Sequence, residues 1–81
     1  MTRRTYSGLE MVKVLTDKGF TPASGAGSHR KLVYEHPETN EKRIVIVPLH
    51  DELATGTPRS IADQAGAKDF DAFCEWIDRN L

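Results

Sequence analysis

The first part of the chain has a helical pattern of hydrophobic residues. Ser7 and Glu10 have the spacing of a capping box, in which both side chains satisfy backbone N–H groups at the start of a helix. Gly19 favours the left-handed backbone conformation that ends a helix. The apolar residues that recur between these signals are Leu9, Val12, Val14 and Leu15. This pattern predicts a helix over about residues 8–18.

Extended segments follow this helix. Residues 20–24 contain a proline and predict an edge strand, and the glycine-rich residues 24–28 predict a turn. Residues 30–36 alternate between two faces, and residues 42–47 form the most apolar run of the chain. Since only a short turn separates these last two runs, we expect an antiparallel meander of three strands.

Two further helices complete the chain. Thr57 as N-cap and Pro58 as first helical residue open one helix, and Gly66 closes it. Asp69 can cap the last helix. The apolar residues of that helix recur at intervals of three and four: Phe70, Phe73, Cys74, Ile77 and Leu81. The order α-β-β-β-α-α predicts an α+β sandwich with helices on one face of the sheet, as one domain over residues 1–81.

Composition limits what such a domain can do. With 81 residues, of which 38% are hydrophobic, the core is small and leaves no room for a large catalytic cavity. Chemistry is therefore expected at the surface, on a substrate that contributes charge of its own, such as nucleic acid. The net charge of −1 argues against coating of nucleic acid by bulk electrostatics. Eight basic and five acidic residues lie in residues 1–47, however, so this part is expected to meet phosphates, whereas residues 48–81 are acidic.

The cellular compartment of the protein is predicted from sequence features that are missing. Cys74 is the only cysteine, so neither a disulfide within the chain nor a cysteine-based metal site is expected. No apolar run approaches the roughly 20 residues that cross a bilayer, and Arg3 and Arg4 are not followed by the apolar stretch of a secretory signal. These features predict a soluble cytoplasmic protein that does not contact a membrane.

His29 is the histidine whose surroundings suggest chemistry. It follows Gly27 and Ser28 and precedes Arg30 and Lys31. Histidine can take or give a proton near neutral pH, which RNA cleavage requires when the 2′-hydroxyl attacks the adjacent phosphate. A glycine turn lets the RNA backbone approach the main chain, and its N–H groups can bind an anion. The two basic side chains could balance charge on the phosphate.

The same residues also allow a simpler interpretation. A histidine in a polar turn is more often a solvated surface residue than a catalyst, and Gly-Ser-His alone is a weak motif. His36 is expected to be solvated, and His50 to be a loop residue rather than a second proton-transfer group. The spacing of the three histidines is unlike that of zinc ligands, so no metal or other cofactor is expected.

The spacing of motifs along the chain resembles that of the HicA toxins. The motifs are Ser7-Gly8-Leu9-Glu10, Lys18-Gly19-Phe20, Gly27-Ser28-His29, Val47-Pro48-Leu49-His50, Gly56-Thr57-Pro58-Arg59-Ser60-Ile61 and Gln64-Ala65-Gly66. Together they cover about residues 7–66. The chain departs from the family pattern in its near-neutral charge, in Pro58 where leucine is common, and in its long acidic last helix.

The resemblance implies both a fold and a function. It implies a domain similar to the double-stranded-RNA-binding domain, α-β-β-β-α, with an additional C-terminal helix. It also implies a toxin that cleaves mRNA without a metal, with His29 as the active histidine, and that a HicB-type antitoxin neutralises by covering the histidine face. Two alternatives stay open: a non-catalytic RNA-binding module of the same fold, and a protein-interaction domain, which the acidic C-terminal part would favour.

Overall fold

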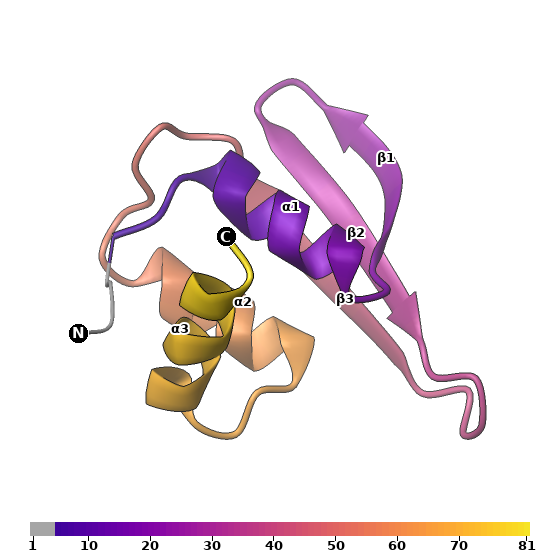
Figure 1. Cartoon of the computed structure of the whole chain (residues 1–81). Helices are drawn as coiled ribbons and strands as arrows, with labels where there is room; N and C mark the ends of the chain where they lie inside the picture. The colour runs from indigo at the N-terminus through magenta and orange to yellow at the C-terminus, as the bar shows by residue number, and fades with distance from the viewer. Residues whose placement is uncertain (1–4) are drawn as a thin grey trace.

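The computed structural model describes residues 5–81 and shows three helices and three strands (Figure 1). They are α1 Gly8–Asp17, β1 Thr21–Ala26, β2 His29–Glu35, β3 Lys42–Pro48, α2 Thr57–Ala65 and α3 Phe70–Arg79. The predicted α+β class and the order α-β-β-β-α-α are confirmed.

The strands form one antiparallel sheet in the order β1-β2-β3, so β2 is paired on both sides. The side chains of each strand alternate between the two faces of the sheet. Leu32, Val45 and Val47 are fully buried on one face, whereas Ile44 and Ile46 on the other face are 45% and 41% exposed. We call this exposed side the open face. The helices therefore cover only one side of the sheet, as the alternation predicts.

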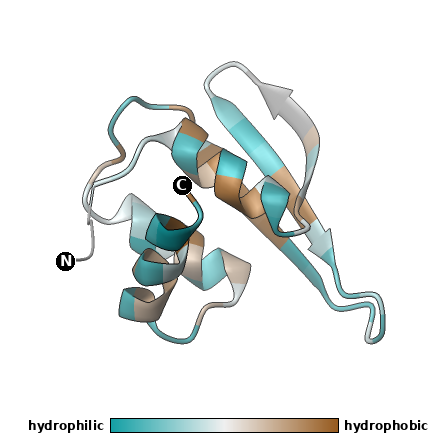
Figure 2. Ribbon diagram, in the orientation of Figure 1, coloured by the Kyte–Doolittle hydropathy of each residue, from teal (hydrophilic) through white to brown (hydrophobic). Residues whose placement is uncertain are grey.

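The hydrophobic core lies between the sheet and the helices. Helices α1 and α2 pack on the strands, and α3 packs on α2 (Figure 1). The helical core residues are Met11, Val14, Leu15, Ile61, Ala62, Phe73, Cys74 and Ile77. Figure 2 shows the hydrophobic stripes on the helices, and it shows that β2 begins with hydrophilic residues before it turns hydrophobic.

Helix α1 confirms one prediction and corrects another. The capping box is present: Glu10 N donates to Ser7 Oγ (3.1 Å), and Ser7 N donates to Glu10 Oε1 (2.9 Å). Leu9, however, is 68% exposed, so its expected place in the apolar stripe is wrong. Met11 takes that place. Because successive residues are about 100° apart around a helix, Leu9 lies roughly 200° from Met11, on the opposite side.

Two predicted boundaries are also wrong. Residues 24–28 are not all turn, because β1 continues to Ala26 and only Gly27 and Ser28 form the turn. Pairing with β2 holds this glycine-rich stretch extended, and a β-bulge between Pro22 and Gly25 absorbs the extra length. The strand β2 accordingly begins one residue earlier than expected, at His29.

The caps of the last two helices follow the predictions with one shift. Gly56 rather than Thr57 is the N-cap of α2, and no side chain caps this end. Gly66 ends α2 with a left-handed φ of 88°, as predicted. Asp69 caps α3 by accepting from the backbone N–H groups of Asp71 (2.9 Å) and Ala72 (3.3 Å), which confirms the predicted cap.

Candidate functional site

A two-residue turn joins β1 to β2 at one end of the sheet. Gly27 has a φ of 61°, and Ala26 pairs with His29 across the turn. A left-handed first turn residue is typical of the type II′ hairpin, which places glycine there. A Cβ at Gly27 would meet no atom within 4 Å. The turn therefore needs glycine for its backbone angle, and it leaves open space around the main chain.

Strand pairing fixes the backbone of His29. As the first residue of the central strand, it has Ala26 of β1 and Pro48 of β3 as its neighbours. Its imidazole is exposed, and its Nδ1 lies 3.5 Å from Ser28 Oγ, the outer limit of a hydrogen bond. The result is a histidine whose main chain is paired with both neighbouring strands and whose ring is accessible.

The two basic residues after His29 lie on different faces of β2. Lys31 is two residues along the strand and so shares the open face with His29, opposite Ile46 of β3. Arg30 is opposite Val47, which points into the core. Adjacent positions in a strand always point to opposite faces, so the sequence neighbours Arg30 and Lys31 do not form one cationic pair beside His29.

The turn at Gly27 and Ser28 is hydrogen-bonded to the segment that follows β3. Leu49 N donates to the carbonyl oxygen of Ser28 (2.6 Å), and Gly8 N donates to the carbonyl oxygen of His50 (2.9 Å). The start of α1, the end of β3 and the turn before His29 are therefore linked by main-chain hydrogen bonds. His50 is exposed and lies two residues beyond Pro48, the cross-strand partner of His29.

Gly8 is a residue whose role the sequence did not reveal. A Cβ built on it would lie 2.0 Å from the carbonyl oxygen of Pro48 and 2.8 Å from Cα of Leu49. Helix α1 can approach the end of β3 this closely only because its first residue has no side chain. The capping box around Gly8 predicted the helix start but gave no signal for this contact.

His36 and Tyr6 have structural roles. His36 is half-buried, and its Nδ1 accepts from the backbone N–H groups of Glu38 (3.1 Å) and Thr39 (3.3 Å), so it holds the β2–β3 turn rather than being solvated as expected. The buried Tyr6 hydroxyl donates toward the carbonyl oxygen of Cys74 and Oδ1 of Asp78. Burial, and then these hydrogen bonds and the nearby charge, raise the pKa of Tyr6 above its ordinary value.

The open face around His29 is part aliphatic and part cationic. Val33 pairs with Ile44 and Lys31 pairs with Ile46, which forms an aliphatic strip of Val33, Ile44 and Ile46 beside the lysine. Within residues 5–81, no three His, Cys, Asp or Glu side chains gather closely enough to hold a metal ion. Over the same residues, no helix has the length and apolar character needed to cross a membrane.

Comparison with known proteins gives one family. A protein-family model described as the HicA toxin of bacterial toxin-antitoxin matches residues 8–67, which include α1, the sheet and α2. Neither the curated proteins nor the solved structures gave a match. The matched range contains the turn and His29 but ends before α3.

Proposed function

The chain belongs to the HicA family of bacterial toxin-antitoxin toxins, and on that basis we propose that it is an endoribonuclease that cleaves mRNA by means of His29. The observation that supports this most is the exposed imidazole of His29 at the start of the central strand. Its backbone is paired on both sides and a glycine turn with open space lies next to it. A general base needs this combination of accessibility and fixed position.

The proposed step is an internal displacement at phosphorus. The 2′-hydroxyl oxygen attacks the adjacent phosphate, the bond from phosphorus to the 5′-oxygen breaks, and a 2′,3′-cyclic phosphate forms. His29 takes the proton of the 2′-hydroxyl while water protonates the leaving 5′-oxygen, or water takes the first proton and His29 protonates the 5′-oxygen. If Nδ1–H donates to Ser28 Oγ, Nε2 is left as the basic atom that faces the substrate.

The phosphate would be held by the residues around the turn. We assign Lys31 to the charge that develops on the phosphate, because it shares the open face with His29. Gly27 and Ser28 position the RNA backbone at the exposed turn. Arg30 lies on the other face of β2. It would contact RNA only if the RNA chain continued around the end of the sheet to that face.

Cleavage in the presence of a chelator tests the proposed function. We expect the purified protein to cut a single-stranded mRNA fragment in excess EDTA, since a histidine moves the proton in the proposed step, and to leave 2′,3′-cyclic phosphate ends. The ends can be identified by mass spectrometry of the fragments. Salt-dependent binding without cleavage would instead identify a non-catalytic RNA-binding module, and absence of both would indicate a protein-interaction domain.

Substitution of the two basic neighbours should have unequal effects. Lys31→Ala is expected to lower the rate of RNA cleavage by about tenfold or more, since one charged contact to the phosphate is lost. Arg30→Ala is the matched control and should change the rate by less than about threefold, because Arg30 is on the opposite face. Cleavage of a fluorogenic RNA by both variants gives the comparison, and a larger loss with Arg30→Ala would contradict the assignment of Lys31.

Family membership implies an antitoxin partner, and we assign it, as a HicB-type protein, to the open face. The aliphatic strip offers Ile44 and Ile46, which are unusually exposed for isoleucine in a strand. The double variant Ile44→Thr/Ile46→Thr keeps β-branched residues and should weaken antitoxin binding by roughly tenfold. Calorimetry with the cognate antitoxin measures this, and unchanged affinity with an unchanged fold would exclude the strip from that interface.

A further inference from the structure

An apolar groove lies on the helical side of the molecule, away from His29. It has a volume of about 460 Å³ and runs between the end of α1, the α2–α3 connection and α3. A second hollow of about 250 Å³ continues it toward the inner face of the sheet. The two share Phe20, Ala65, Gly66 and Trp76. Tyr34, which lines the second hollow, is five residues along β2 from His29, or roughly 17 Å.

Aromatic side chains form much of the wall of this groove. Phe20 packs against Tyr34 with ring centroids 5.3 Å apart, and Phe73 packs against Trp76 at 5.9 Å. Leu15 and Ala72 complete the apolar surface. A small polar ligand needs several convergent polar groups to orient it. Because this lining is mainly hydrocarbon, it is better suited to a large apolar side chain of a polypeptide.

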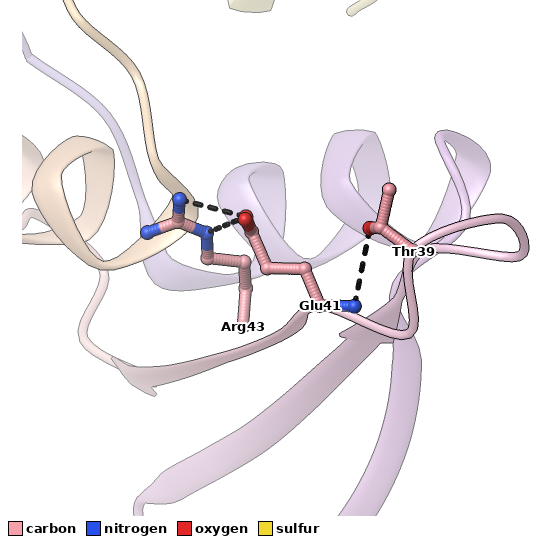
Figure 3. Close-up of polar contacts among 3 residues, drawn as sticks. All are labelled: Thr39, Glu41 and Arg43. Carbon is pink, nitrogen blue, oxygen red and sulfur yellow. Dashed lines mark hydrogen bonds and ion pairs between the residues drawn. The ribbon is translucent and has the colours of Figure 1, made fainter.

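The charged residues at the rim favour an acidic occupant. Lys18 lines the second hollow and Lys68 lines the first, and both are exposed without an ion-pair partner among residues 5–81. The carboxylates at the groove are already engaged. Glu41 Oε1 accepts from Arg43 Nε (2.9 Å) and Nη2 (2.8 Å), as Figure 3 shows, and Asp69 caps α3. The two hollows are lined by three basic residues, Lys18, Arg43 and Lys68, against the two carboxylates, so the net charge of the rim is positive.

We propose that this groove binds an acidic segment of a partner protein, which inserts one large apolar side chain between Phe20 and Trp76. The toxin-antitoxin family supplies the antitoxin as that partner. Its contact here would be separate from any contact with the open face. The proposal rests on family membership and on the groove, and it does not depend on the chemistry of His29.

Trp76 is the only tryptophan in the chain and lines both hollows, so its fluorescence reports on the groove directly. The probe is the acetylated and amidated peptide Asp-Glu-Leu-Phe-Asp-Glu. We expect it to shift Trp76 emission in a saturable manner. A peptide with Gly-Ser in place of Leu-Phe should not bind, and Lys-Lys-Leu-Phe-Lys-Lys should bind at least tenfold more weakly. No saturation at 1 mM, or equal binding of the Gly-Ser peptide, would overturn the proposal.

Substitutions in the groove test whether the peptide binds there. The double variant Lys18→Glu/Lys68→Glu should weaken binding of the acidic peptide by about tenfold, several-fold for each exposed charge. The control Lys13→Glu reverses an exposed charge that does not line the groove and should have little effect on binding. Ala72→Leu should fill the groove and reduce binding at least tenfold. Its matched control is Ala54→Leu, an exposed alanine elsewhere. Equal losses in the controls would contradict binding in the groove.

Two further measurements identify the class of partner. Ala72→Leu should also weaken the complex with the cognate antitoxin in calorimetry, and an unchanged complex would exclude the antitoxin as occupant. A twelve-nucleotide oligouridylate should leave Trp76 emission unchanged. If it shifts the emission and displaces the peptide, the groove is an RNA site and the proposal is wrong. His29→Ala should bind the peptide as the wild type does, so failure of the proposed cleavage mechanism would not affect this test.

Discussion

His29→Ala is expected to lower the rate of RNA cleavage by about 10² to 10⁴, the usual contribution of a general acid or base. The fold should survive, because the ring is exposed and the strand pairing of residue 29 uses only its backbone. Cleavage of a fluorogenic RNA gives the rate, and the thermal midpoint shows whether the variant is folded. The same variant should lose growth arrest when it is expressed in bacteria.

His50→Ala is the matched control for this experiment. His50 is exposed and its carbonyl oxygen, rather than its ring, bonds to Gly8. We therefore expect it to retain most of the cleavage rate. A folded His29→Ala that cleaves at more than a tenth of the wild-type rate would remove His29 from the mechanism, and a comparable loss in His50→Ala would make His50 a second proton-transfer group.

Gly8→Ala is expected to destabilise the fold by about 3 kcal/mol, the upper part of the range for overpacking. The added methyl group would lie 2.0 Å from the carbonyl oxygen of Pro48, and this contact is with backbone rather than with a flexible side chain. Helix α1 and the end of β3 must then move apart. For a domain of this size the thermal midpoint should fall by roughly 15 °C, which scanning calorimetry can measure.

Gly56→Ala provides the control, since Gly56 has a φ of −83° and no atom within 4 Å of a built Cβ. Because Gly56 is the N-cap of α2 and alanine is a weaker N-cap than glycine, its free energy of unfolding should fall slightly, by less than about 1 kcal/mol. If Gly8→Ala is as stable as Gly56→Ala, the close approach of α1 to Pro48 is not needed for stability. A destabilised but folded Gly8→Ala should also cleave RNA more slowly, because the Pro48–His50 segment flanks the turn before His29.

The candidate site was predicted only in part. The glycine turn and an accessible histidine after it follow from local residue types, because turn chemistry and exposure depend on few neighbours. The grouping of Arg30 with Lys31 was based on adjacency in the sequence. His29 is the first residue of β2, so the alternation of side chains along the strand places Lys31 on the same face as His29 and Arg30 on the opposite face. That start depends on pairing with Ala26 and Pro48, which lie elsewhere in the chain.

The sequence by itself determined the order of elements, which follows from the pattern of hydrophobic residues. It also determined the capping box at Ser7 and Glu10 and the glycines that stop α1 and α2, Gly19 and Gly66, since a helix end depends on residues within one helical turn. The tertiary structure alone decided the contact of Gly8 with Pro48 and the groove beside Trp76. Both arise where segments distant in the sequence meet, and local residue preferences contain no information about how closely such segments approach.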